Sequence, residues 1–125
     1  MTKAETAVCL KHNGYNCCQA VLGAFAEETD FSEDQLKKLG IAFGGGMGCM
    51  EGTCGALCAA EMLLGVLKYD GKPLRADAAA LHKAFTQRCG ASVCKELKGV
   101  GTGKVLCECD DCVRIAAELA EGLKL

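Results

Sequence analysis

Cysteine is the residue type through which this sequence could do chemistry, because 11 of its 125 residues are Cys. A thiolate is both a nucleophile and a ligand for soft metals. Several cysteines lie at predicted helix starts, where unpaired N–H groups and the helix dipole favour thiolate over thiol. If those starts converge, they would stabilise an anionic site such as a metal cluster. The cysteines at predicted helix starts are Cys17, Cys18, Cys54, Cys94, Cys109 and Cys112.

The spacing of the cysteines fits known metal patterns only in part. Cys107-x-Cys109-x-x-Cys112 is compact enough to supply three ligands of one metal, and a distant fourth Cys would suit zinc. It lacks the paired Cys-x-x-Cys knuckles of a zinc ribbon. Cys49, Cys54 and Cys58 form C-x4-C-x3-C, close to the C-x4-C-x2-C of plant-type ferredoxins without matching it.

A glycine-rich segment could add backbone donors to the same site. Successive N–H groups in such loops form concavities that bind phosphates and iron–sulfur centres. A simple hinge is the alternative interpretation. The glycines concerned are Gly44, Gly45, Gly46 and Gly48.

Other reactive side chains have a structural interpretation, because buried free cysteine is a common small core residue. We expect Cys9 and Cys89 to be packing residues, and Cys18 fits either role. His12 and His82 are isolated and are expected at the surface or satisfied in the core. Glu61, on an apolar helix, is expected to be a hydrogen-bonded buried carboxylate.

These residues are predicted to lie on an all-α fold, a single domain over residues 1–125. Six or seven short helices are expected around a buried central helix that Thr53 caps and that runs to about Tyr69. Further helix starts are indicated by Thr2, Asn16, Ser32 and Ser92, and by the apolar spacing after about 74 and 110. The stops are expected near 12, 28, 43, 89 and 97.

Composition excludes several classes of function. Fourteen basic against 16 acidic residues give a net charge of −2, with no Trp, so we expect no nucleic-acid partner. No signal-like N-terminus and no span of sufficient length are visible, so a soluble cytoplasmic protein without membrane contact is expected. Thiols stay reduced there, which argues against eleven structural disulfide cysteines.

Five segments recur in the order known from one family. They are Asn16-Cys17-Cys18-Gln19-Ala20-Val21-Leu22, Gly44-Gly45-Gly46-Met47-Gly48, Cys54-Gly55-Ala56-Leu57-Cys58-Ala59, Cys94-Lys95-Glu96-Leu97-Lys98-Gly99, and Cys109 spaced before Val113 and Ala116. The chain resembles the C_GCAxxG_C_C family of redox-active proteins, related to the N-terminal part of split-Soret cytochromes. The resemblance covers nearly the whole chain.

The resemblance implies that Cys17, Cys54, Cys94 and Cys109 hold an iron–sulfur centre. Ala59 replaces the last Gly of the central motif, and the segment between Cys94 and Cys109 is short. No Cys-x-x-Cys-His occurs, so haem attachment does not carry over. Additional cysteines crowd the same segments and form a second tier of candidate ligands: Cys49, Cys58, Cys107 and Cys112.

The leading hypothesis is a small redox or electron-transfer protein that binds an iron–sulfur cluster and exchanges electrons with a redox partner protein. One alternative is a thiol–disulfide enzyme or sensor, with Cys54 attacking and Cys94 or Cys109 resolving. Another is a structural zinc module, or a protein with no cofactor. Whether the chain is an enzyme and whether it forms a homodimer stay open.

Overall fold

The computed structural model describes residues 1–123, and every regular element among them is helical. Seven right-handed α-helices and the short α4 segment confirm the all-α prediction. Two 3₁₀ turns, η1 (Ala26–Glu28) and η2 (Ile41–Phe43), extend α2 and α3. The helices are α1 (Lys3–His12), α2 (Cys17–Ala24), α3 (Glu33–Gly40), α4 (Gly44–Met47), α5 (Gly55–Lys68), α6 (Arg75–Cys89), α7 (Cys94–Leu97) and α8 (Cys109–Gly122).

Three helix starts are fixed by the capping boxes that the sequence predicts. The side chains of Thr2, Asn16 and Ser32 each accept a hydrogen bond from the N–H three residues later, and the side chain of that later residue accepts one from the backbone N–H of the capping residue. Such a box satisfies N–H groups that the helix leaves unpaired. Asn16 also donates to the carbonyls of Gly40 and Ile41, 3.2 Å away in each case, which ties the start of α2 to the end of α3.

Two predicted caps are wrong. Thr53 and Ser92 do not cap α5 and α7, whose N-cap residues are Cys54 and Val93, with no side-chain cap hydrogen bond. Thr53 instead pairs with Val93 in an isolated antiparallel β-bridge. This long-range pairing fixes the backbone before both helices, so a local cap is not needed there.

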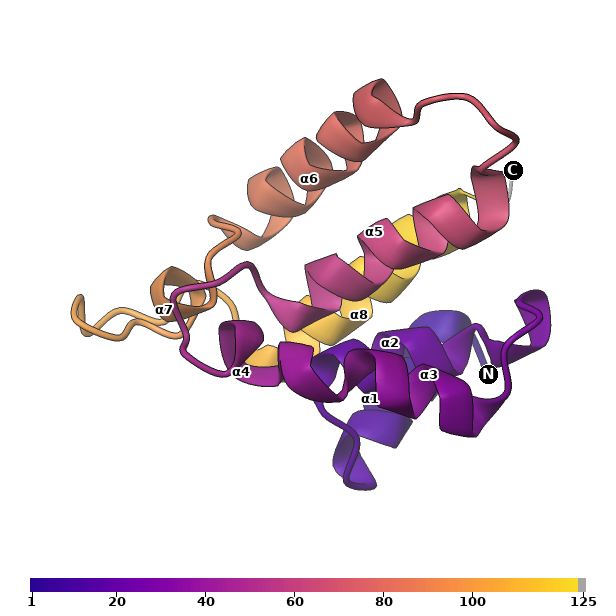
Figure 1. The fold of residues 1–125 in the computed structure, drawn as a ribbon. Coiled ribbons are helices and arrows are strands. Elements are labelled where there is room, and N and C mark those ends of the chain that lie inside the picture. The colour runs from indigo at the N-terminus through magenta and orange to yellow at the C-terminus, as the bar shows by residue number, and fades with distance from the viewer. Residues whose placement is uncertain (124–125) are drawn as a thin grey trace.

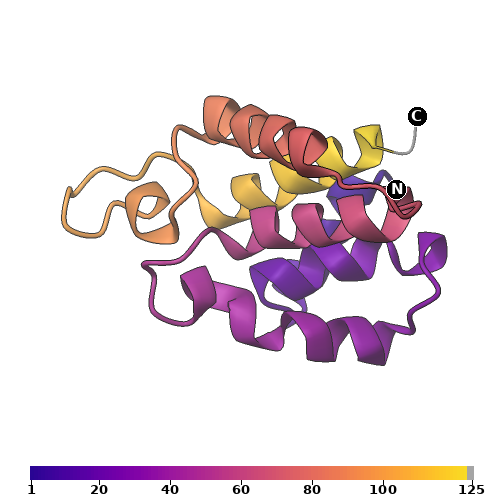
Figure 2. The same cartoon turned by 45° about the horizontal axis from the view of Figure 1, so that its top comes forward.

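Helix α5 is the central element, as expected from its apolar sequence. It contacts α2, α6 and α8, and α1 packs across α2 and α8 (Figure 1). In Figure 2 helix α6 lies over α5 and α8, so α5 is covered on several sides. Ala56, Leu57, Ala60 and Leu63 on α5 are fully buried. No helix in the part of the chain described here has the length and apolar character needed to cross a membrane.

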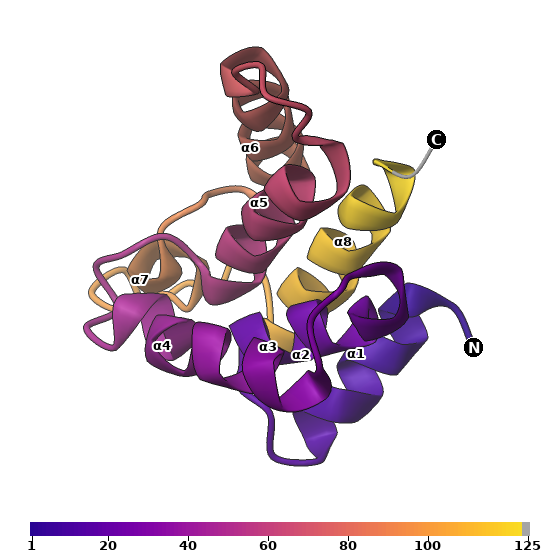
Figure 3. The same ribbon diagram turned by 45° about the vertical axis from the view of Figure 1, so that its right-hand side comes forward.

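The arrangement gathers several helix starts at one end of the molecule. The segments α4 and α7 lie together there, and the N-terminus and the end of α8 lie at the other end (Figure 3). Segment α4 is irregular, as expected for a glycine-rich stretch. Gly45 and Gly46 have φ of +65° and +61°, in the left-handed region that favours glycine.

Candidate functional site

The four family cysteines come together at the α4–α7 end. Cys17 begins α2, Cys54 precedes α5, Cys94 begins α7 and Cys109 begins α8. The Cys17 thiol is close enough to share hydrogen bonds with the thiols of both Cys54 and Cys109. Cys94 interacts electrostatically with Cys17 and Cys109. The starts of these four helices therefore converge, as the positions of the cysteines required for a shared site.

Backbone pairing holds Cys54 and Cys94 side by side. The N–H of Cys54 donates to the carbonyl of Ser92 at 2.8 Å, and the N–H of Cys94 donates to the carbonyl of Gly52 at 3.0 Å. These bonds flank the Thr53–Val93 bridge. Two cysteines 40 positions apart in the sequence are thus positioned by the main chain, not by flexible side chains.

Two glycines allow close approach around these sulfurs. A Cβ on Gly55 would lie 2.5 Å from the Cys17 Sγ and 2.7 Å from the Phe43 carbonyl oxygen. A Cβ on Gly46 would lie 2.5 Å from the Cys94 Cβ and 3.4 Å from its Sγ. The packing around Cys17 and Cys94 therefore requires glycine at both positions.

The glycines predicted to contribute to a cofactor site differ in what they contact. The N–H of Gly45 donates a hydrogen bond toward the Cys17 sulfur. Gly46 packs on Cys94, whereas Gly44 lies against the Asn16 side chain. Gly48 ends α4 in a left-handed conformation, and nothing lies within 4 Å of a Cβ placed on it. The cofactor-binding role of all four stays a prediction.

The expectation that helix starts lower the thiol pKa values is wrong for the metal-free protein. A hydrogen bond with Cys112, outweighing the opposite effect of Cys17, raises the pKa of Cys54 to about 12, and burial adds to it. The hydrogen bond with Cys109 is the largest single influence on Cys17 and lowers its pKa. The hydrogen bond with Cys54, burial and the Cys54 charge together raise that pKa by more. The hydrogen bond with Cys17, then burial, raises the pKa of Cys109. Crowding and desolvation therefore raise the pKa values of these buried thiols.

One cation lies among the thiols. The Lys98 ammonium is half-buried, and its Nζ is 3.9 Å from the Cys112 Sγ. Burial lowers its pKa, but the charges of Cys112, Cys109 and two further cysteines raise it by more. Lys98 in turn lowers the pKa of Cys94, against the larger raising effect of burial. A cation in this place favours the thiolate forms that metal binding requires.

A second group of sulfurs adjoins the first. The Sγ atoms of Cys89, Cys107 and Cys112 all lie within 4.8 Å of one another, and all three residues are buried. Among residues 1–123, these three cysteines are the group whose ligand atoms lie close enough together to hold one metal ion. The thiol hydrogen bond between Cys112 and Cys54 connects them to the family cysteines.

The closeness of Cys89 to two other sulfurs is not predicted by the sequence, in which it was expected to be a packing residue. Cys89 is buried, as a packing residue would be, but its sulfur belongs to the three-sulfur group. It ends α6, where a left-handed Gly90 terminates the helix and turns the chain. No local pattern relates it to Cys107, because the two are brought together only by the packing of α6 beside α8. The count of cysteines was the only sequence signal.

Of the remaining candidates, Cys18 and Cys58 adjoin the family site, because each interacts electrostatically with Cys17. Cys9 is exposed on α1, so its assignment as a packing residue is wrong. Cys49 is exposed, and its Sγ donates to the Gly46 carbonyl at 3.6 Å. Cys58 is half-buried and Cys18 is fully buried, and desolvation raises the pKa of each.

The histidines and Glu61 are not ligands of either group. The exposed His12 pairs with Asp110 through Nε2, 2.6 Å from Oδ2. His82 is exposed on α6. Glu61 is half-buried, and burial raises the pKa of its carboxyl. Among residues 1–123, the group whose ligand atoms are close enough to hold one ion consists of cysteines.

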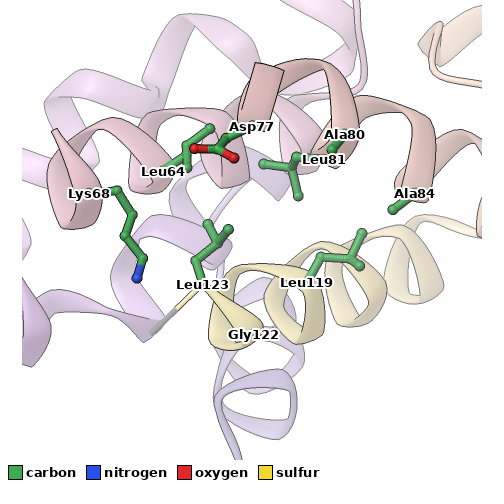
Figure 4. Close-up of a pocket in the computed structure, with 9 residues that line it drawn as sticks. All are labelled: Leu64, Lys68, Asp77, Ala80, Leu81, Ala84, Leu119, Gly122 and Leu123. Atoms are coloured by element: carbon green, nitrogen blue, oxygen red, sulfur yellow. The ribbon is translucent and has the colours of Figure 1, made fainter. Parts of the chain in front are cut away.

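A hollow of about 510 Å³ between α5, α6 and α8 lies away from the cysteines. Its walls are mostly apolar, with Leu64, Leu81, Leu119 and Leu123 facing one another (Figure 4). It contains no cysteine and sits toward the ends of α5 and α8, whereas the sulfurs lie at their starts. It therefore does not belong to the candidate site.

Comparison with known families agrees with this geometry. Residues 15–123 match the family model described as "Putative redox-active protein (C_GCAxxG_C_C)". The match spans all the cysteines of both groups, and the chain belongs to this family. No match was found among curated proteins or among solved structures. A redox-active protein with clustered cysteines is the class that the fold and the site define.

Proposed function

We propose that this protein is a small electron carrier whose four family cysteines bind an iron–sulfur cluster. The observation that carries the proposal is the meeting of Cys17, Cys54, Cys94 and Cys109 at one buried end of the helical domain. Their side chains come from four different helix starts, so ligands distant in sequence surround one volume. All-sulfur ligation is typical of iron–sulfur clusters.

The surroundings of the sulfurs support this cofactor. The N–H groups of Gly45 and Leu57 favour the thiolates of Cys17 and Cys54, and N–H donors to sulfur tune cluster potentials. Gly55 and Gly46 let the Cys17 sulfur and the Cys94 Cβ pack in places where an added Cβ would lie 2.5 Å from them. Lys98 offsets part of the negative charge that four thiolates carry.

When bound, the cluster would supply one-electron transfer at a potential set by its environment. The chain holds the ligands through the rigid starts of its helices and shields them, since Cys17, Cys54 and Cys94 are each less than 8 % exposed. Cys109 is half-buried, which leaves this ligand nearest to solvent. We infer that the electron donor or acceptor is another protein that docks at this end.

The two alternative functions have less support. A nucleophilic thiol needs its thiolate at neutral pH, but the pKa of Cys54 is raised to about 12 and its side chain is 2 % exposed. A single tetrahedral zinc ion needs sulfurs about 3.8 Å apart, from Zn–S bonds of about 2.3 Å. Zinc has no redox chemistry, whereas the family to which the chain belongs is described as redox-active. The family description therefore favours a redox cofactor over a structural zinc ion.

Anaerobic reconstitution with iron and sulfide tests the proposal. Iron and acid-labile sulfide should appear in equal amounts, with visible absorption from sulfur-to-iron charge transfer. Cys54→Ser should lower both by most of their value, since this residue contacts other thiols on two sides. Cys9→Ser, at an exposed thiol that belongs to neither sulfur group, is the matched control and should leave both unchanged.

A colourless protein that retains no iron after reconstitution would refute the cluster. Zinc bound in stoichiometric amount, with unfolding by a chelator, would instead favour the structural zinc module. Loss of two free thiols on mild oxidation, reversed by a dithiol, would favour the disulfide alternative.

A further inference from the structure

We propose that Cys89, Cys107 and Cys112 form a second, separate metal site, which binds one soft monovalent ion, copper(I), through three sulfurs. The proposal is independent of the iron–sulfur cluster, because none of the three is among the family cysteines. It rests on the mutual approach of the three Sγ atoms within 4.8 Å, their burial and the charges around them.

The separation of the sulfurs fits one ion. Three ligands in a plane around an ion, with bonds of about 2.3 Å, place the sulfurs about 4.0 Å apart. The observed limit of 4.8 Å therefore needs only a small contraction on binding. All three come from different elements: Cys89 ends α6, Cys107 follows the loop after α7, and Cys112 lies in the first turn of α8. Such ligands are fixed by the packing of those elements.

The number of sulfur ligands in the group indicates which metal ion it would bind. Thiolates prefer copper(I), zinc and iron–sulfur clusters. Zinc in structural sites takes four ligands, and this group contains three residues, with no histidine or carboxylate. A fourth thiol, that of Cys54, hydrogen-bonds with Cys112, but it also pairs with Cys17 in the family site. If Cys54 serves the family site, three sulfurs remain for this ion, and three are enough for copper(I), which accepts low coordination numbers.

Cationic side chains near the three sulfurs would offset the negative charge of a copper(I)–thiolate complex. Binding of one Cu⁺ by three thiols releases three protons to solvent and leaves a net charge of −2. The Lys98 ammonium, 3.9 Å from the Cys112 Sγ, offsets one of these charges. The Arg114 guanidinium faces Cys107 and adds positive potential, which it shares with its ion-pair partners Asp111 and Glu118.

An entry path is present on the Cys107 side. A surface hollow of about 330 Å³ has Cys107 in its wall, together with Arg88, Val105 and Leu106. Cys107 is 8 % exposed, whereas Cys112 is fully buried. The N–H of Cys107 donates to the Leu97 carbonyl at 3.3 Å, which holds the rim ligand in place. An ion arriving through the hollow meets Cys107 first.

Two measurements on the full chain test the site. Substoichiometric copper(I), added anaerobically, should give an X-ray absorption spectrum with three sulfurs at one distance and no copper–copper vector. Competition with a coloured copper(I) chelator should then show that Cys107→Ser weakens the first equivalent by more than about 100-fold, beyond the loss expected for a group that only supports a ligand. Cys9→Ser should bind copper(I) as the unaltered chain does.

Because Cys107 lies at the rim, its replacement by Ser is expected to preserve the fold, which circular dichroism checks. If the variant does not fold, the sulfur count of the unaltered chain still decides the matter. Two or four sulfurs per copper, or a copper–copper vector at low loading, would overturn the three-sulfur site. Unchanged affinity in folded Cys107→Ser would do the same. Neither result depends on iron and sulfide content, so failure of this site is distinguishable from failure of the proposed cluster.

Discussion

The contact between Gly55 and Cys17 gives a sharp test of how the site is built. In Gly55→Ala the new Cβ would stand 2.5 Å from the Cys17 Sγ and 2.7 Å from the Phe43 carbonyl oxygen. Comfortable contacts between such atoms are about 3.5–4.0 Å, so each is more than about 0.8 Å too short. The Cys17 sulfur, the start of α5 or the turn at Phe43 must move.

The magnitude follows from two opposing effects. Overpacking of a tight interior costs about 1–3 kcal/mol. Replacing glycine by alanine in a helix gains up to about 1 kcal/mol, and less at the first position of a helix. We therefore expect Gly55→Ala to lower the free energy of unfolding by about 1–2 kcal/mol. Gly65→Ala is the matched control on the same helix, because nothing lies within 4 Å of its added Cβ, and it should raise the free energy by up to about 1 kcal/mol.

Thermal unfolding of the reduced, metal-free variants, followed by circular dichroism, measures this difference. For a chain of this length we expect the two melting temperatures to differ by about 10 °C, with Gly65→Ala higher. After reconstitution, Gly55→Ala should also hold less iron than Gly65→Ala, because its Cys17 sulfur is displaced. Equal melting temperatures and equal iron contents would refute the close packing of Gly55 against Cys17.

Three further predictions concern a cap, a titration and a charge. Asn16→Ala should lower the free energy of unfolding by about 2 kcal/mol, and Ser32→Ala should lower it by about 1 kcal/mol. The difference is expected because the Asn16 side chain also donates hydrogen bonds to two carbonyls outside its own helix. Urea unfolding of the two variants measures it. Metal-free protein should lose stability as pH rises from about 9 to about 12, since the raised pKa of Cys54 keeps its thiol neutral in the folded chain while unfolded thiols ionise. A pH-independent urea midpoint over that range would contradict it. Lys98→Met should make the reduction potential of the reconstituted protein more negative, whereas Lys98→Arg should leave it nearly unchanged; equal potentials in voltammetry would contradict the proposed charge effect.

Local signals in the sequence predicted most of the fold. The capping boxes at Thr2, Asn16 and Ser32 are satisfied within three residues, so they do not depend on the rest of the chain. The apolar sequence of α5 predicted a central helix, because a helix that is apolar nearly all round must be covered by other elements. Thr53 and Ser92 failed as caps because the bridge between Thr53 and Val93 is a long-range pairing. No local pattern indicates such a pairing.

The positions of the candidate cysteines could be indicated from the sequence, whereas their surroundings could not. The order of the family segments indicated Cys17, Cys54, Cys94 and Cys109, and the structure brings them together. The environment of each thiol depends on its neighbours in space. The position of Cys54 before a helix predicted a favoured thiolate, but its hydrogen bond with Cys112 and its burial raise its pKa.

The measurement that tests the central claim most directly is a potentiometric titration of the anaerobically reconstituted protein, followed by visible absorbance. We expect a one-electron wave in which the charge-transfer absorption bleaches on reduction and returns on oxidation, with the number of free thiols unchanged. A two-electron wave without visible absorption, accompanied by the loss of two thiols on oxidation, would contradict the account.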